Sequence, residues 1–412
     1  MESRKRILVT GIGQSNFLKQ LYSSIHHVTP NTYEFDIFGL NELSGKDEYG
    51  IEIFSKVYAV RKKVLFKDIK NLFDLKLFTL SIKFVRYGLS FRSVKNFAKK
   101  YIITKSLFEE YNFNDYDGVH IHFPTFDKLD IYWHIPAKMK CIVSFWGSDL
   151  MRSKGLFNYY IQDHITNRAD LITTHGNEMK QQMLTKFGRQ LENKILFTRF
   201  APFDHLYSLM EEKLSHPKKD FGSFLTKYHI PVNKKIVVIG HNGSPGNNHL
   251  KIIEALKKLS IEIKDSSFFV LPFAYKPSKD DSYAAKCQEA LVKAGLQGML
   301  LKDFLSWDDL AIFKRITDIM IHMPVSDALS GAMTEALFSG SKVITGDWLP
   351  YSPFTKEGLI FESTDFDNLP EDFIKAYNAL PEEEKVVLKN RAIIKNRFLS
   401  DYCAKTWLPV FN

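Results

Sequence analysis

The chain has 412 residues, of which 45% are hydrophobic, and a formal net charge of +9. This length allows two to three domains with large cores, and no apolar run reaches the roughly 18 residues of a membrane-spanning helix. The start lacks a signal-peptide core, and the three cysteines are far apart, without metal-ligand spacing. We therefore expect a cytoplasmic location, reduced thiols and a negatively charged partner. Nucleic acid is not the expected partner, because no zinc-finger, helix-turn-helix or RNA-binding signature is present.

The first expected strand, 6–10, ends in a glycine turn that holds Gly11, Gly13 and Gln14, and a helix follows from about Phe17. A glycine turn between a strand and a helix lets the backbone approach a ligand closely. This turn lacks the third glycine of a dinucleotide fingerprint, so NAD is not the expected ligand. An ordinary strand-to-helix turn is the alternative interpretation.

Residues 61–105 form the most basic region, with 13 lysines and arginines against two acids, Asp68 and Asp74. Apolar residues at helical spacing run through this region from Phe73 to Phe84. Two interpretations remain open. The helix could lie on an anionic membrane surface, or it could pack by its apolar side while its lysines stay in water.

Each later strand of the first half runs into polar residues. In an open parallel sheet the ligand site lies at the carboxyl ends of the strands, so these side chains should gather at one edge of a doubly wound domain. For several of them a structural role is equally open, as a core histidine, a buried indole or a helix cap. The residues are His120 and His122, Trp146, Ser148 and Asp149, His175, and Arg199.

A second series of strands and helices follows a charged connection at about 204–233. Its first strand runs into a turn rich in glycine and asparagine, 241–249, which lies between a strand and a helix and is a candidate anion site. From Pro381 onward the pattern is helical. The strands of this half are expected at 235–240, 267–273, 298–301, 316–323, 342–345 and 358–361.

The stretch 324–351 predicts a second anion site. Ser330 and Gly331 lie where a helix should start, and Gly340 lies where it should end. Unpaired N–H groups and the helix dipole make such a start a site for phosphate. Glu335 lies one to two turns into the helix, from where its carboxylate could reach sugar hydroxyls. The segment therefore predicts a site for a nucleotide-sugar.

These features together resemble the GT-B glycosyltransferases, and within them the family 4-like branch. The motif of that branch, E-G-F-G-x4-E-A-x3-G-x-P-V-I, corresponds here to Asp327, Glu335, Gly340 and the pair 343–344. The resemblance implies two Rossmann-like doubly wound α/β domains that face a cleft, with a C-terminal helix that returns to the first domain. The implied domains are 1–205 for the acceptor, 206–387 for the nucleotide-sugar, and 388–412 for the returning helix.

The resemblance also implies roles for single residues. Glu335 would bind the ribose hydroxyls, and Asp327 would take the place of a glutamate that contacts the donor sugar. His122 matches a histidine beside that sugar, and Asp149 is a candidate acceptor base. Combining the resemblance with the polar residues at the strand ends, we assign three groups of residues. The catalytic residues are His122, Asp149 and Asp327, and the acceptor-binding residues are Gln14, Trp146, Ser148 and His175. The donor-binding residues are Gly13, Arg199, His241, Asn242, Gly243, Ser330, Gly331 and Glu335.

The chain departs from the branch at several positions. Asp327 is shorter than the usual glutamate, and Ala328 and Ser330 replace two glycines. The arginine and lysine that often contact the diphosphate are not found after strand 235–240, where His241 and His249 stand instead. The HNGSPGNNH turn and the later FFVLPFAYKP also resemble bacterial transferases of 4-acetamido-4,6-dideoxygalactose (Fuc4NAc), which act on lipid-linked intermediates.

The sequence thus predicts a glycosyltransferase that moves a sugar from a nucleotide-sugar to a lipid-linked or glycan acceptor in bacterial surface polysaccharide biosynthesis. It would be cytoplasmic or peripheral at the inner face of the plasma membrane, where 61–105 would meet the anionic surface. No cofactor and no metal are expected, because no D-x-D pair lies in a suitable loop. The alternatives are a GT-B nucleotide-sugar epimerase and a non-catalytic transferase-like binding protein.

Overall fold

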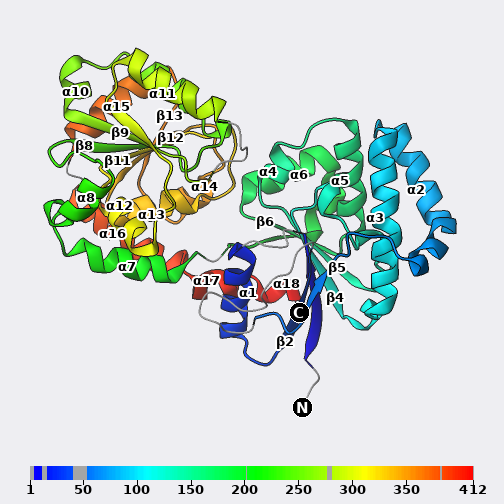
Figure 1. Ribbon diagram of the computed structural model, residues 1–412. Helices are drawn as coiled ribbons and strands as arrows, with labels where there is room; N and C mark the ends of the chain where they lie inside the picture. Colours follow the sequence, from blue (N-terminus) through cyan, green and yellow to red (C-terminus); the bar gives the residue numbers. More distant parts are fainter. Residues whose placement is uncertain are drawn as a thin grey trace. The chain divides into compact units, whose positions relative to one another are not determined.

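The computed structural model describes residues 4–11, 16–39, 53–200, 202–275, 281–380 and 383–411. The chain forms two compact units: unit 1 is Met1–Pro202 with Ser400–Asn412, and unit 2 is Phe203–Leu399 (Figure 1). Both are parallel α/β structures, as the alternating strands and helices predict. Within the described ranges, no helix is both long and apolar enough to cross a membrane.

Unit 1 is built on a parallel sheet of seven strands in the order β3-β2-β1-β4-β5-β6-β7. The chain moves outward from β1 in one direction and then resumes on the other side with β4, so the strand order reverses between these two strands. Open sheets of this kind bind ligands at that switch point. The strands are β1 (Lys5–Thr10), β2 (Tyr33–Gly39), β3 (Val57–Ala59), β4 (Gly118–His122), β5 (Lys140–Ser144), β6 (Leu171–Thr174) and β7 (Ile195–Phe197).

One face of this sheet is covered by the first helix and by the C-terminal end of the chain. Leu21 and Ile25 of α1 pack with Trp407 and Phe411 against β1 and β2, so helices from both ends of the sequence lie side by side (Figure 1). The helices of unit 1 are α1 (Asn16–Val28), α2 (Leu75–Arg86), α3 (Phe91–Glu110), α4 (Ser148–Met151), α5 (Leu156–Arg168), α6 (Asn177–Phe187), α17 (Ser400–Lys405) and α18 (Leu408–Phe411), with 3₁₀ turns η1 (Phe66–Phe73), η2 (Phe113–Asp115), η3 (Phe126–Lys128), η4 (Tyr132–His134) and η5 (Arg189–Lys194).

Unit 2 repeats this plan with six parallel strands in the order β10-β9-β8-β11-β12-β13, and its switch point lies between β8 and β11. Side chains alternate between the two faces: Val237 and Ile239 join one core cluster, and Ile236 and Val238 join another. The strands are β8 (Lys235–Ile239), β9 (Ser267–Pro272), β10 (Gly298–Leu301), β11 (Ile319–His322), β12 (Lys342–Gly346) and β13 (Glu362–Thr364).

Helices cover both faces of the second sheet (Figure 1). Ile252 of α9, Leu291 of α11 and Phe373 of α15 pack on one face, and Phe224 of α8 and Phe313 of α12 pack on the other. The helices are α7 (Asp204–Leu214), α8 (Gly222–Lys227), α9 (His249–Leu256), α10 (Ile261–Ser266), α11 (Ser282–Ala294), α12 (Trp307–Ile316), α13 (Gly331–Ser339), α14 (Ser352–Lys356), α15 (Leu369–Asn378) and α16 (Glu384–Arg397), with 3₁₀ turns η6 (Lys218–Phe221) and η7 (Pro245–Asn247).

The predicted return of the C-terminal helices to the first domain is confirmed, but it begins later than expected. Helix α16 still belongs to unit 2, because Ile394 is fully buried in the cluster formed with α7 and α13. The chain enters unit 1 at Ser400 rather than at residue 388, and it leaves unit 1 after Pro202 rather than after residue 205.

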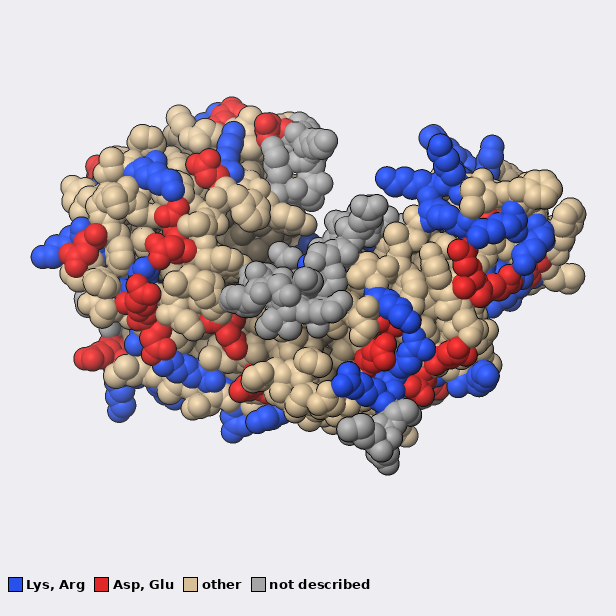
Figure 2. Space-filling view, turned by 60° about the horizontal axis from the view of Figure 1, so that its bottom comes forward, with Lys and Arg blue, Asp and Glu red and all other residues tan. Residues whose placement is uncertain are grey.

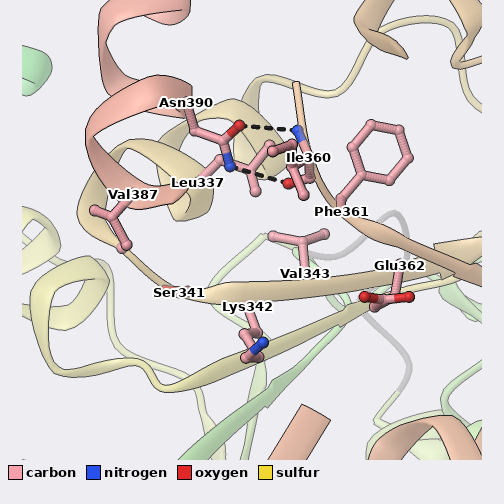
Figure 3. A pocket seen from close by; sticks show the side chains of 10 residues that line it. Leu337, Ser341, Lys342, Val343, Ile360, Phe361, Glu362, Val387 and Asn390 are labelled. Carbon is pink, nitrogen blue, oxygen red and sulfur yellow. Dashed lines mark hydrogen bonds between the residues drawn. The ribbon is translucent and has the colours of Figure 1, made fainter. Parts of the chain in front are cut away.

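The last strand of unit 2 also differs from the prediction. The expected strand 358–361 is not a strand, and β13 begins at Glu362 instead. The side chain of Asn390 in α16 accepts a hydrogen bond from the Ile360 N–H (2.8 Å) and donates one to the Ile360 carbonyl (2.9 Å). These bonds, visible at the edge of a pocket of about 40 Å³ (Figure 3), occupy both backbone groups that a ladder would use.

A close backbone approach fixes the switch point of unit 1. Gly11 follows β1 with a φ of +116°, and a Cβ at this position would lie 1.8 Å from the carbonyl oxygen of His122 at the end of β4. Only glycine fits both the conformation and the space. The glycine after the first strand is therefore required by the neighbouring strand, whatever else it contacts.

We predict that Gly11→Ala destabilises the chain more than a glycine substitution with only a conformational penalty. Gly88→Ala is the matched control, because Gly88 also has a positive φ, +94°, but nothing lies within 4 Å of its added Cβ. The control should lose about 1 kcal/mol of unfolding free energy, and Gly11→Ala should lose roughly 1 to 3 kcal/mol more. Equal losses in urea unfolding would show that the approach to His122 imposes no constraint.

Candidate functional site

The C-terminal edge of the second sheet places an ionised carboxylate at its switch point. His322 ends β11 and is fully buried, and its Nε2 donates to Asp327 Oδ2 at 3.0 Å. The Tyr351 hydroxyl donates to the same oxygen at 2.9 Å, and the Ala328 N–H donates to Oδ1 at 2.8 Å. The Asp327 side chain remains 25% exposed. A ligand at this edge can therefore reach it.

The surroundings hold Asp327 in its charged form. Burial alone would raise the pKa of this carboxyl, but the hydrogen bond from His322 and the charges of His322 and His241 lower it to about 2. Burial and the neighbouring carboxylate raise the pKa of Tyr351 well above its usual value, so its hydroxyl stays a donor. Since Nε2 of His322 faces a carboxylate, it carries the proton. Nδ1 is buried and has no hydrogen-bond partner in the described part of the chain.

Three neighbours hold the segment that carries Asp327. The Asn248 side chain donates to the Met323 carbonyl (2.8 Å), and the Trp348 indole donates to the Pro324 carbonyl (2.9 Å). The Val325 N–H donates to the Gly246 carbonyl (2.8 Å). The loops after β8, β11 and β12 are therefore joined, and this fixes the carboxylate in position before any ligand arrives.

The N-terminus of α13 lies a few residues further along the chain. Ser330 caps it, because its hydroxyl accepts from the Met333 N–H (3.3 Å). The amides of Gly331 and Ala332, in contrast, have no acceptor among the described residues. Two open N–H groups at the positive end of a helix favour an anion. The predicted helix start at Ser330 and Gly331 is thus present.

Glu335 turns back toward this helix start. Its Oε1 would be 3.9 Å from a Cβ at Gly331, and its Oε2 lies 2.6 Å from Nζ of Lys314 in α12. The two side chains are 20% and 13% exposed, so the pair is largely shielded from water. A carboxylate, a cation and two open amides thus meet at one place.

Lys314 was missed by the sequence analysis. It lies at the end of α12, before β11, whereas a diphosphate-binding cation is expected in the turn after β8. Nothing in its local sequence separates it from the other lysines of a basic chain. The pairing with Glu335 identifies it.

The turn at 241–249 is braced mainly by its own side chains. The Asn247 amide donates to Oδ1 of Asn242 (2.8 Å), which also accepts from the Ser244 N–H (2.9 Å). The Gly243 N–H, predicted to face a phosphate, donates to the Tyr275 carbonyl at 2.7 Å. His241 is exposed, and its ring lies 5.1 Å from that of His322. In this turn the His241 side chain, rather than the Gly243 amide, is open to a ligand.

In unit 1, the histidines at the end of β4 are engaged with the protein. The Tyr22 hydroxyl lies 2.7 Å from His120 Nδ1 and 2.8 Å from His122 Nε2, and both histidines are fully buried. The Trp146 indole, which can only donate, lies 3.3 Å from His122 Nδ1. Nε2 of His122 therefore carries the proton and donates to Tyr22, which donates in turn to His120. His120 Nε2 then donates to Ser144 at 2.6 Å.

Burial lowers the pKa of His122 well below its usual value and that of His120 to about 3, so this series of hydrogen bonds is uncharged at neutral pH. The sequence left His122 open between a sugar contact and a hydrogen-bonded core histidine. Its geometry favours the core role, because protein groups occupy both ring nitrogens. The predicted contact with the donor sugar remains a prediction.

Two of the predicted acceptor residues, Trp146 and His175, lie against Phe200. The Trp146 ring stacks on Phe200 with centroids 3.7 Å apart, and the His175 ring lies 4.4 Å from it. Ser148, half-buried, begins α4 two residues after Trp146. Arg199 lies next to Phe200 in the chain, and its N–H donates to Thr406 (3.0 Å) while its guanidinium lies over Tyr402. Gly13 and Gln14 fall outside the described residues.

Asp149 holds the turn after β5 rather than capping a helix. Its carboxylate accepts from the N–H groups of Trp146 (2.9 Å) and Leu150 (3.1 Å), and Gly147 occupies the cap position. Burial raises the pKa of Asp149 to about 7 against the opposing effect of these N–H groups. A pKa near neutrality suits a base, but the side chain is only 2% exposed.

No group of three or more His, Cys, Asp or Glu side chains suited to a metal ion occurs among the described residues. The side chains and backbone groups described at the edge of the second sheet are amides, carboxylates, imidazoles and one ammonium. These can bind a phosphate and a sugar without a further group on the protein.

No protein-family model matches the sequence, and no curated protein matches it either. Solved structures do. A glycosyltransferase from Rickettsia africae is 14% identical with a TM-score of 0.67, and the match covers 100% of this chain and 98% of that one. HepE from Anabaena, in complex with UDP and glucose, is 13% identical with a TM-score of 0.65 and 99% coverage of both chains. Trehalose 6-phosphate synthase from Burkholderia multivorans is 11% identical with a TM-score of 0.67, over 100% and 96%.

These likenesses extend over the whole chain, which consists of two parallel-sheet α/β units with a C-terminal segment that returns to the first unit. The chain has the GT-B fold, which confirms the fold class expected from the sequence. At identities of 10 to 14% the comparisons establish the fold alone.

We predict that Asp327 contributes to the acid sensitivity of the fold. Its pKa of about 2 lies below the roughly 3.9 of an unfolded aspartate, so its stabilisation is present above about pH 4 and is lost as the pH falls toward 2. Because the side chain is partly exposed to water, we expect roughly 1 to 2 kcal/mol. Urea unfolding of Asp327→Asn should show a correspondingly smaller loss over this pH range than the unsubstituted chain.

The control is Asp303→Asn, at an exposed carboxylate of the same unit. Its free energy of unfolding should change with pH as that of the unsubstituted chain does, across the whole range. If Asp327→Asn also follows it, the carboxylate is not held by His322 and Tyr351 in solution.

Proposed function

We propose that this chain is a glycosyltransferase that takes its sugar from a nucleoside diphosphate donor bound by unit 2. The observation that carries the proposal is the meeting of the two open amides of α13, the Lys314–Glu335 pair and the ionised Asp327 at the edge of one sheet. A nucleotide-sugar needs these groups: donors for its phosphates and acceptors for its hydroxyls. The complexes of HepE with UDP and UDP-glucose support the choice of ligand class.

In this proposal the helix start and Lys314 receive the diphosphate. When the bond between the sugar and the diphosphate breaks, negative charge grows on the leaving phosphate oxygen. The amides of Gly331 and Ala332, the dipole of α13 and the Lys314 ammonium lie ready to stabilise that charge. Because these groups already supply positive potential, the reaction as we propose it proceeds without a metal ion.

Glu335 and Asp327 would then hold the two sugars of the donor. Glu335 accepts from the ribose hydroxyls, and its separation from Lys314 to reach them frees the ammonium for phosphate. Asp327 keeps one oxygen for His322 and Tyr351, and its other oxygen can accept from a hydroxyl of the transferred sugar. We propose an amino-deoxy sugar such as Fuc4NAc as the transferred sugar, because the HNGSPGNNH turn and the FFVLPFAYKP stretch resemble those of Fuc4NAc transferases.

We further propose a lipid-linked or glycan acceptor in bacterial surface polysaccharide biosynthesis, with the chain peripheral at the cytoplasmic face of the membrane. The aromatic group formed by Trp146, Phe200 and His175 in unit 1 is the candidate acceptor surface, since aromatic rings bind sugar faces and leave hydroxyls to polar neighbours.

One observation favours a second function, the GT-B nucleotide-sugar epimerase. His241, His322 and Asp327 lie together at the edge of the second sheet, and an epimerase needs such acid–base groups beside the sugar. The products separate the two. An epimerase converts the nucleotide-sugar alone into its epimer, whereas a transferase leaves it intact until an acceptor is added.

We predict that Lys314→Met weakens the binding of a nucleoside diphosphate. A hydrogen bond to a charged group contributes about 1.5 to 3 kcal/mol, so the Kd for UDP in isothermal titration should rise roughly 10- to 100-fold. Uridine, which has no phosphate, should lose little or no affinity. Lys302→Met, at an exposed lysine of unit 2, is the control and should bind UDP like the unsubstituted chain.

Unchanged UDP affinity in Lys314→Met would remove the cation from the donor site. If no nucleoside diphosphate bound at millimolar concentration, the donor site itself would be wrong and the non-catalytic binding protein would become the leading hypothesis.

A further inference from the structure

Unit 1 exposes an unusual amount of apolar surface on η1, α2 and the start of α3. Eleven of the 25 large hydrophobic side chains exposed in the described chain lie in the 28 residues from Val64 to Phe91. Monomeric soluble proteins seldom gather exposed apolar residues in this way unless the surface has a partner. We call this surface the crest: Val64, Leu65, Phe66, Ile69, Leu72, Phe73, Leu75, Phe78, Ile82, Val85 and Phe91.

Helix α2 shows that the crest is not needed for packing. The stripe predicted from the sequence, Leu77 and Leu80 with Phe84, is buried, and Phe84 packs edge-on against Phe97 and Trp133. This confirms the packed interpretation for that stripe. The crest forms a second stripe on the same helix, at 75, 78, 82 and 85, and it faces solvent.

A helix surrounded by water normally keeps such a face polar. Phe78 is 67% exposed, and Phe73, which keeps helical spacing with Leu77 in the sequence, is 88% exposed at the end of η1. The fold therefore gains nothing from these side chains in water. They indicate that this helix meets a second apolar environment.

The charges beside the crest are positive and available. The two acids of the region are already used: Asp68 pairs with Arg61 (3.0 Å) and Asp74 with Lys105 (2.5 Å). Figure 2 shows the lysine and arginine side chains gathered on the part of unit 1 that α2 and α3 form. The exposed cations here that pair with no described carboxylate are Lys62, Lys63, Lys76, Lys83, Arg86, Arg92, Lys95 and Lys99, of which Lys76 donates to the Trp133 carbonyl.

This combination selects one kind of partner. A second copy of the chain would bring the same positive charges to the contact, and like charges oppose a symmetric interface. An anionic lipid surface offers negative headgroups to the cations and an acyl boundary to the phenylalanines. Lysine stems can lie along the apolar layer while their ammonium groups stay among the headgroups.

We propose that η1 and α2 insert the crest into the interface of an anionic bilayer, with the helix in the membrane plane. This goes beyond the charge attraction suggested by the basic region, because insertion of apolar side chains would carry much of the binding. The proposal rests on the surface of unit 1 alone, and it stands or falls independently of the donor site. If both hold, the chain works where a lipid-linked acceptor is found.

The test is co-sedimentation of the full chain with vesicles of phosphatidylcholine alone or mixed in equal parts with phosphatidylglycerol. Binding to the mixed vesicles should survive a rise from about 0.1 M to about 1 M salt in substantial part, because screening removes the charge term but not the apolar term. The triple variant Phe66→Ser, Phe73→Ser, Phe78→Ser should partition about 100-fold less. Lys83→Gln with Arg86→Gln should weaken binding about tenfold at low salt only.

Phe304→Ser is the matched control, because Phe304 is 81% exposed in unit 2; it should bind vesicles like the unsubstituted chain. Urea unfolding should be the same in all these variants as in the unsubstituted chain, which shows that they are folded without relying on the donor site. Binding that disappears at 1 M salt and ignores the phenylalanine substitutions would overturn insertion. So would an absence of vesicle binding together with self-association that the triple variant abolishes.

Discussion

Both units depend on how a histidine is buried at the end of their central strand. His122 ends β4 and His322 ends β11, and each is fully buried. A buried imidazole needs hydrogen-bond partners, because desolvation without them is costly. The hydrogen-bond partners of these two histidines differ between the edge of the first sheet and the edge of the second. His122 is bonded to neutral groups that fill its surroundings, while His322 is bonded to a carboxylate that still reaches solvent.

This difference gives the two edges different chemistry. The edge of unit 1 is a network of neutral hydrogen bonds that positions Trp146 and its aromatic neighbours. The edge of unit 2 holds a fixed negative charge at Asp327, with the open amides of α13 and the Lys314–Glu335 pair in the same group of loops. Although the chain is strongly basic, this edge has one described cation at the helix start, and the positive excess lies on α2 and α3 instead. The net positive charge of the chain is thus concentrated on its proposed membrane surface and not at its proposed donor site.

Much of the fold could be predicted because it depends on local patterns. Strand and helix alternation, the glycine after the first strand of each sheet and the helix start at Ser330 and Gly331 are visible in sequence, and they are present as expected. The strand expected at 358–361 failed because a side chain 30 residues away, Asn390, takes its backbone hydrogen bonds. Periodicity cannot show such a competitor.

The site was predictable to the extent that it lies on one loop and one helix. A single stretch of sequence contains Asp327, Ser330 and Glu335. Lys314, in contrast, can be recognised as a site residue only from the packing of α12 beside α13. The two stripes of α2 could not be separated for another reason: the sequence left open whether its apolar residues pack or face a membrane, and it could not show that the helix has two apolar faces. The sequence could not predict the hydrogen bond between His122 and Tyr22 either, because the two residues are 100 positions apart.

The most direct test is a crystal structure of the full chain with UDP bound. The account predicts the diphosphate at the amides of Gly331 and Ala332 beside Lys314, with the ribose hydroxyls on Glu335 and Asp327 facing the position of the sugar. A nucleotide bound instead at the edge of the first sheet, beside Gly11 and Trp146, would contradict the assignment of the donor to unit 2.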